Sequence, residues 1–137
     1  MRTTLDKCLT RRSFLLAGGA GLLAAVPLVH AGLGAASGSH EVFLSASDGD
    51  VALSIMETTA VVDLVITDVI MPGIDGVELA ERVRQRWPAT RVLFMSGFAG
   101  DRLTARGIGD NDELLLQKPF ALRDLSDRVR ALLDKPR

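Results

Sequence analysis

The stretch VVDLVITDVIMPGIDG, residues 61–76, decides the fold and raises a question of chemistry. An apolar run at 64–66 ends at a carboxylate, Asp68, and a Pro-Gly turn then leads to a second acid, Asp75. A continuous apolar centre is typical of a parallel strand that is covered on both faces. A carboxylate at the edge of a core is costly unless another group pairs with it or uses it. We therefore expect a buried strand whose last residue, Asp68, takes part in a site.

Around this stretch, β-prone and amphipathic segments alternate along the chain. Strands are predicted at 41–47, 62–68, 91–96 and 113–117, and helices at 51–59, 75–87 and 121–134. Asp50 and Asp75 are the expected N-caps of the first two helices, because an Asp side chain accepts hydrogen bonds from the free N–H groups there. The glycine-broken stretch 97–112 predicts a short helix or a loop. Alternation of this kind predicts an α/β fold with a parallel sheet between helices.

Three of the predicted strands end at groups with chemical potential, namely Asp68, Ser96 and Lys118. The carboxyl ends of parallel strands share one edge of the sheet, so these side chains should gather there. A carboxylate is a competent nucleophile toward a phosphoryl group, whose charged oxygens need a cation and hydrogen-bond donors. Taken singly, each of these residues is more often a turn former or a solvated side chain. Their joint placement favours a phosphate-accepting site at Asp68.

Composition argues against several other classes of function. The net charge of −1 and the aromatic content of 4% argue against a nucleic-acid partner. The single cysteine, Cys8, leaves no internal disulfide and no Cys/His cluster for zinc. An aspartyl phosphohydrolase is disfavoured, because such enzymes carry a second acid two residues after the nucleophile, where this chain has Ile70. We therefore expect a protein that is not an enzyme.

Residues 1–39 differ in character from the rest of the chain. No Asp, Glu, Lys or Arg lies between Arg12 and Glu41, and basic residues precede this apolar, Gly/Ala-rich stretch. The layout is typical of a secretory signal, and TRRSFLL at 10–16 is similar to a twin-arginine export signal. The alternative is a membrane-associated N-terminal helix. We divide the chain into a signal-like segment, 1–39, and a domain, 40–137. Export through this segment, or membrane association if it is retained, is the alternative to a cytoplasmic location.

Several longer words of the sequence strongly resemble the receiver domain of bacterial two-component response regulators. These words are VDLVITDVIMPGIDGVELAERVR, RVLFMSG and LLLQKPF, with HEVFLSASDGDVAL upstream. The resemblance covers residues 40–134, and the ending KPFALRDLSDRVRALLD is similar to receivers attached to hybrid sensor kinases. It implies a flavodoxin-like, doubly wound parallel sheet. It also implies a phosphoacceptor module of a cytoplasmic phosphorelay, with a histidine kinase or phosphotransfer protein as its partner.

The resemblance gives the residues at the strand ends specific roles. It implies that Asp68 is the phosphoacceptor, that Ser96 is the switch hydroxyl and that Lys118 pairs with the phosphate. It further implies a cis peptide bond before Pro119. Magnesium would be bound by Asp68 and by the backbone carbonyl of Ile70.

The N-terminal segment departs from the family pattern, in which a first strand is followed by an acidic pair that binds magnesium. The usual spacing, counted back from 41–47, puts this pair near 22–25, which reads LLAA, and no acid lies at 7–40. The first strand and helix are thus missing or replaced, and SFLLA or LLAAVPLV is the candidate replacement strand. Leu115 stands at the family's aromatic switch position. We therefore expect weak or absent Mg²⁺ binding, and a pseudo-receiver that binds proteins without phosphorylation remains the alternative.

Overall fold

Strands and helices alternate as the sequence predicts in the residues that the computed structural model describes, which are 12–18, 41–59, 61–97 and 114–135. The strands are β1 (Arg12–Ala17), β2 (Glu41–Ala46), β3 (Leu64–Asp68), β4 (Arg91–Ser96) and β5 (Leu115–Gln117). The helices are α2 (Gly49–Thr58), α3 (Gly76–Arg86) and α5 (Leu122–Asp134). The bounds of the predicted elements differ from these by about one or two residues, as is usual at element ends.

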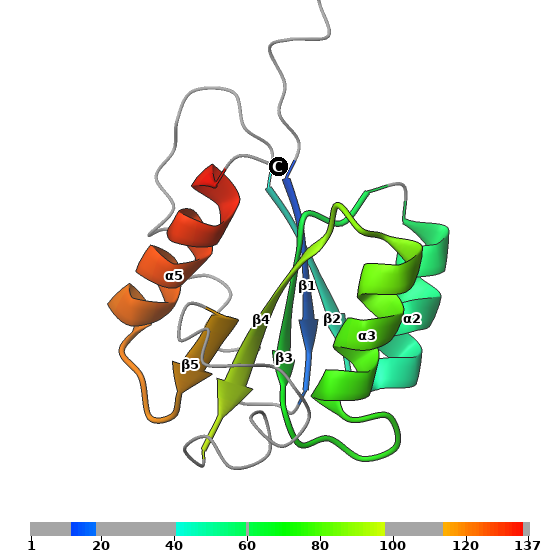
Figure 1. Cartoon of the computed structure of the whole chain (residues 1–137), viewed down its shortest axis with the longest axis horizontal. Coiled ribbons are helices and arrows are strands. Elements are labelled where there is room, and N and C mark those ends of the chain that lie inside the picture. The colour runs from blue at the N-terminus through cyan, green and yellow to red at the C-terminus, as the bar shows by residue number, and fades with distance from the viewer. Residues whose placement is uncertain (1–11, 19–40, 60, 98–113, 136–137) are drawn as a thin grey trace, which may run out of the picture.

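The five described strands form one parallel sheet in the order β2-β1-β3-β4-β5. All of them run in the same direction, so their carboxyl ends meet at one edge of the sheet (Figure 1). Helices α2 and α3 cover one face of the sheet, and α5 covers the other (Figure 1). The predicted flavodoxin-like, doubly wound architecture is therefore confirmed.

Alternate residues of the inner strands supply two hydrophobic cores, one on each face of the sheet. In β1, Leu15 belongs to the core under α2 and α3, whereas Leu16 belongs to the core under α5. In β3, Val65 belongs to the core under α2 and α3, and Ile66 belongs to the core under α5. All four side chains are buried. Burial on both faces explains why β3 reads as a continuous apolar run rather than an alternating one.

The strand β1 replaces the first strand of the fold, which the sequence left as either missing or replaced. Of the two candidate stretches, SFLLA forms it, and β1 pairs in parallel with β2 on one side and β3 on the other. A strand with two neighbours needs its ladder N–H groups, and the other candidate stretch contains Pro27, which has none. The sheet thus extends into the segment 1–39, and residues 12–16 of the stretch that resembles an export signal belong to an inner strand.

The end of β1 lies earlier in the chain than the expected position of the acidic pair. The strand ends at Ala17, and Gly18 follows, where its N–H donates to the Ala46 carbonyl at 3.3 Å. The expected position, 22–25, was therefore wrong for the end of this strand, and it lies outside the described residues. The error arose from a fixed spacing to β2, whereas residues 18–40 separate the two strands.

Asp48, and not the predicted Asp50, is the N-cap of α2. Asp48 Oδ1 accepts a hydrogen bond from the Val51 N–H at 2.9 Å, and the Ser47 hydroxyl donates to Asp48 Oδ2 at 2.8 Å. The backbone hydrogen bond from Val51 and the side-chain hydrogen bond from Ser47 hold the pKa of Asp48 below its usual value. The helix therefore begins earlier than expected, and this start leaves Val51 exposed.

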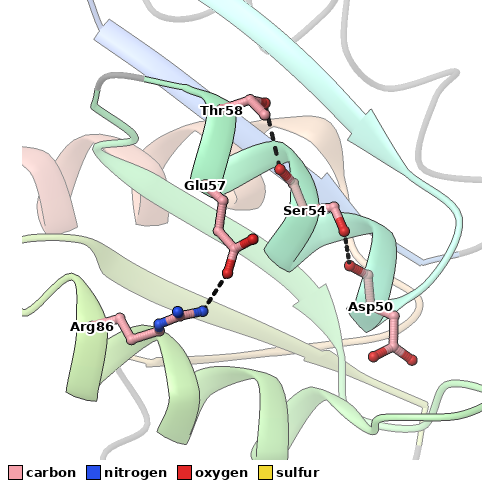
Figure 2. A network of polar contacts seen from close by, with 5 residues as sticks. All are labelled: Asp50, Ser54, Glu57, Thr58 and Arg86. Carbon is pink, nitrogen blue, oxygen red and sulfur yellow. Dashed lines mark hydrogen bonds and ion pairs between the residues drawn. The ribbon is translucent and has the colours of Figure 1, made fainter.

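Helices α2 and α3 are linked by a polar contact on the surface. Figure 2 shows Glu57 of α2 paired with Arg86 of α3, whose guanidinium carbon also lies 5.5 Å from the centre of the Trp87 ring. Within α2, the Ser54 hydroxyl donates to the Asp50 carbonyl at 3.0 Å (Figure 2). The side chains of Glu57 and Arg86 are 52% and 59% exposed, so solvent screens their attraction.

Helices α3 and α5 agree with the sequence prediction. Asp75 caps α3, and its Oδ1 accepts a hydrogen bond from the Glu78 N–H at 2.9 Å. The apolar stripe expected on α5 is buried at its centre, at Leu125, Val129 and Leu132. These two helices pack on opposite faces of the sheet, where β3 ends at Asp68 and β5 ends one residue before Lys118.

Two predicted features fall largely outside the described residues. The glycine-broken stretch 97–112 is described only at Gly97, and the apolar stretch of the N-terminal segment is not described from residue 19 to residue 40. In the parts of the chain that are described, no helix has the length and apolar character needed to cross a membrane.

Candidate functional site

Strand register brings the three candidate residues to the same edge of the sheet. Asp68 is the last residue of β3 and lies beside Met95 of β4, and Ser96 is the last residue of β4 and lies beside Gln117 of β5. The Lys118 N–H continues this ladder by donating to the Ser96 carbonyl at 2.7 Å. Asp68 and Lys118 therefore flank the end of β4, where Ser96 lies between them.

Asp68 and Lys118 form a direct ion pair. Lys118 Nζ lies 2.5 Å from Asp68 Oδ1. Asp68 ends β3 and Lys118 directly follows β5, and these two strands are not adjacent in the sheet. The Asp68 side chain is 18% exposed, whereas that of Lys118 is 43% exposed. The carboxylate is thus largely enclosed, and the ammonium that pairs with it is more exposed. The pairing answers the question raised by a carboxylate at the end of a buried strand.

The backbone around Asp68 is tightly packed. The Val69 N–H donates to the Met95 carbonyl at 2.9 Å, and the Gly76 N–H donates to the Val69 carbonyl at 2.9 Å. A Cβ atom on Gly76 would lie 2.0 Å from the Asp68 carbonyl oxygen, so only glycine fits at the start of α3. The Thr67 hydroxyl donates to that same carbonyl at 3.0 Å. These contacts fix the backbone of Asp68 at the end of β3.

Gly18 packs directly against the Asp68 carboxylate. A Cβ atom on Gly18 would lie 2.4 Å from Asp68 Oδ2, which is far closer than non-bonded atoms approach. The residue also has a φ of +128°, a conformation that side-chain-bearing residues rarely adopt. The sequence pattern did not single out Gly18, because the position of this residue depends on which stretch forms β1. The signal for it is the glycine pair that directly follows SFLLA.

The resemblance gave a role to four further positions, namely Ser96, Ile70, Pro119 and Leu115. Ser96 is half-buried at the end of β4. Ile70 follows Asp68 by two residues, and its side chain is 58% exposed. The peptide bond between Lys118 and Pro119 is cis, as the resemblance implied. Leu115, at the aromatic switch position, is half-buried and packs on the core under α2 and α3.

A metal ion at this edge of the sheet would need a group of ligating side chains. Within the described ranges, no three or more His, Cys, Asp or Glu side chains are grouped so that they could hold a metal ion. Asp68 is the carboxylate available at the end of β3, and one of its oxygens is paired with Lys118. The arrangement offers a nucleophilic carboxylate with an adjacent fixed cation, which suits the acceptance of an anionic group.

Comparison with known proteins gives a family and several relatives. A family model described as the response regulator receiver domain matches residues 28–130. The response regulator receiver protein CpdR of Brucella abortus is 39% identical over 70 residues, which are 51% of this chain and 58% of that protein. The sensor kinase CckA of the same organism is 37% identical over 91 residues, which are 66% of this chain and 10% of the kinase.

Solved structures show the same fold. A response regulator receiver protein from Sinorhizobium medicae superposes with a TM-score of 0.73 at 26% identity, and the match covers 96% of this chain and 98% of that one. The chain spans less than two thirds of the two curated relatives named above. The similarity therefore concerns the domain and not the whole of those proteins.

Proposed function

The chain belongs to the response regulator receiver domain family, and on this premise we propose that it is a phosphoacceptor module phosphorylated on Asp68. The observation that carries this proposal is the ion pair of 2.5 Å between Asp68 Oδ1 and Lys118 Nζ at the carboxyl edge of the sheet. It supplies both a nucleophile and a fixed positive charge for the incoming group.

The proposed step is phosphoryl transfer from a phosphohistidine. A carboxylate oxygen of Asp68 forms the new P–O bond while the P–N bond of the phosphohistidine breaks. The electron pair of that P–N bond stays on the imidazole nitrogen, which takes up one proton. The products are an acyl phosphate on Asp68 and a neutral histidine on the donor.

Lys118 and Ser96 have supporting roles in this proposal. The Lys118 ammonium, already beside the carboxylate, compensates the charge on the phosphoryl oxygens as transfer proceeds. Ser96 ends the strand between those of Asp68 and Lys118, and its hydroxyl is the donor assigned to a phosphoryl oxygen. The new charge at Asp68 then draws Ser96 inward and shifts a balance between two conformations.

Receiver domains interact with histidine kinases or phosphotransfer proteins, and we assign such a protein as the phosphodonor of this chain. These donors act in the cytoplasm, where ATP is available, so we assign the chain to the same compartment. Export or membrane association through the segment 1–39 is the alternative. A separate hydrolytic activity is not proposed, because Ile70 stands where an aspartyl phosphohydrolase has its second acid.

Receiver domains also generally bind Mg²⁺. We propose that Mg²⁺ binding by this chain is weakened or absent because the acidic pair is missing. The end of β1 is followed by Gly18, and the sequence has no Asp or Glu between residues 7 and 40. A carbonyl of Ile70 and the Asp68 carboxylate alone form a poor ligand set for an ion that prefers octahedral oxygen coordination.

The same observation supports a second candidate function. A receiver that lacks its metal-binding acids acts as a pseudo-receiver, which binds a partner protein without being phosphorylated. In that case the Asp68–Lys118 pair has a structural role and holds the ends of β3 and β5 in register.

Incubation with a small acyl phosphate, followed by intact-mass measurement, separates the two candidates. The phosphoacceptor proposal predicts a mass gain of one phosphoryl group, which is lost in Asp68→Asn. The absence of any gain, with or without Mg²⁺, in protein that binds its partner would favour the pseudo-receiver.

A further inference from the structure

The ligand set around Asp68 does not fit a divalent cation. Mg²⁺ requires about six oxygen ligands near 2.0–2.1 Å and is usually anchored by one or two carboxylates. Here Asp68 Oδ1 already contacts Lys118 Nζ at 2.5 Å. No group of three acidic, His or Cys side chains is found in the described parts of the chain. Among the described residues, the family's usual ion therefore lacks a cluster of side-chain ligands.

The second oxygen of the carboxylate faces Gly18. Because a Cβ atom at this position would lie 2.4 Å from Asp68 Oδ2, a carboxylate-bearing residue cannot stand there while Asp68 keeps its place. The φ of +128° at Gly18 disfavours a side chain independently of the contact. Gly18 thus permits the close approach of β1 to Asp68 and removes a possible ligand at the same time.

The net charge of the Asp68–Lys118 pair also disfavours a divalent cation. Asp68 and Lys118 together are neutral, so a divalent cation arriving at this pair meets the ammonium and no surplus negative charge. A phosphoryl group on Asp68 brings a charge of about −1.5 to −2, which Lys118 already offsets in part. The fixed cation of this site is therefore the lysine side chain.

We infer that Gly18 positions the Asp68 carboxylate against Lys118 and that the resulting pair accepts a phosphoryl group without a divalent cation. The acceptance of a phosphoryl group rests on the proposed function. The lack of a divalent-cation site does not rest on it, and the two parts are tested separately.

The cation-free state is tested on the full chain by titrating Mg²⁺ and following backbone amide signals by NMR. A receiver domain known to bind Mg²⁺ serves as the positive control. We expect no saturable shift at Asp68, Val69 or Ser96, and shifts confined to other acidic residues also support the inference, because they leave the site unoccupied by the ion. A saturable shift at Asp68 that is lost in Asp68→Asn overturns it.

The phosphorylation part is tested with a small acyl phosphate in Mg²⁺ and in a chelator. We expect rates that differ by less than about twofold, because the pair with Lys118 supplies the positive charge. Phosphorylation that occurs only with Mg²⁺ overturns the inference. If neither condition gives phosphorylation, the proposed function fails, and the Mg²⁺ titration still decides whether the site binds the ion.

The positioning role of Gly18 has a matched control in Gly73, the other described glycine with a positive φ, at +73°. A Cβ atom on Gly73 would meet only Asp50 Oδ2, at an ordinary 3.5 Å. We expect Gly18→Ala to shift the side-chain carboxyl ¹³C signal of Asp68 and to slow phosphorylation by about 10²-fold. Gly73→Ala should leave both unchanged. Equal effects of the two variants, or no effect of Gly18→Ala on the carboxyl signal, would show that Gly18 does not position the Asp68 carboxylate.

Discussion

Lys118 Nζ lies 2.5 Å from Asp68 Oδ1, although β4 lies between β3, which ends at Asp68, and β5, which ends one residue before Lys118. The contact exists because parallel strands end at one edge and the Lys118 N–H extends the ladder from Ser96. It is formed by one largely enclosed side chain and one that is 43% exposed. Because Lys118 is partly exposed, the pair contributes little to stability, and the role proposed for it is chemical.

The first prediction concerns Lys118. Lys118→Met should slow phosphorylation by a small acyl phosphate about 10²–10³-fold, because a preorganised positive charge is lost at the reacting group. Lys118→Arg keeps the positive charge, so it should slow phosphorylation less than Lys118→Met does. The free energy of unfolding of Lys118→Met should change by less than about 1 kcal/mol, since the pair is partly exposed. Intact-mass time courses and urea denaturation measure the two quantities, and an unchanged rate would contradict the role of the ammonium.

The second prediction concerns the replacement strand β1. Leu15 is fully buried, so Leu15→Ala should lower the free energy of unfolding by about 2–5 kcal/mol. Val61 is 59% exposed, and Val61→Ala should change the free energy of unfolding by less than about 0.5 kcal/mol. Denaturation curves of both variants test whether residues that resemble an export signal belong to the folded domain. Equal stability of the two variants would argue that β1 is not part of the core.

The third prediction concerns pH and Asp48. The pKa of Asp48 is lowered in the folded state, chiefly by the hydrogen bond from the Val51 N–H, so the ionised cap stabilises the protein above the ordinary Asp pKa. This contribution is lost as the pH falls through the lowered pKa. Asp48→Asn keeps a capping oxygen that does not titrate, so it should be less stable than wild type near neutrality. The difference should shrink in acid, and thermal melts across this range measure it.

The fourth prediction concerns the pair of Glu57 and Arg86 (Figure 2). A double-mutant cycle with Glu57→Ala and Arg86→Ala should give a coupling free energy of about 0.2–1 kcal/mol, because both side chains are more than half exposed. The cycle cancels the separate loss of the Arg86 contact with Trp87. High salt should reduce the coupling. A coupling that persists unchanged in salt would indicate a less screened contact than the exposed fractions imply.

Much of the fold was predictable because local and tertiary requirements agree in its strongest elements. The apolar run that leads to Asp68 has to be a strand covered on both faces, and Asp75 can cap only the helix that follows it. The positions of Asp68 and Lys118 at one edge followed from parallel strands alone. These features depend on hydrophobic periodicity and on turn-forming residues, both of which can be read from the sequence.

Other features depended on contacts that a sequence pattern does not specify. Asp48 and Asp50 are both acceptable caps, and in the structure the Asp48 side chain accepts the capping hydrogen bond from Val51. The location of β1 required a choice between two apolar stretches, and Pro27 could have decided it, because an inner strand has to donate every ladder hydrogen bond. The role of Gly18 emerges only when β1 and β3 are side by side, since it depends on an approach to Asp68 Oδ2.

The central claim, that Asp68 accepts a phosphoryl group, is tested most directly by reductive trapping. The protein is treated with a small acyl phosphate and then with borohydride, which converts an aspartyl phosphate to homoserine, and the peptides are mapped by mass spectrometry. We predict homoserine at position 68 in wild type and at no position in Asp68→Asn. Homoserine at another aspartate, or at none in folded wild-type protein that has been exposed to the phosphodonor, would contradict the claim.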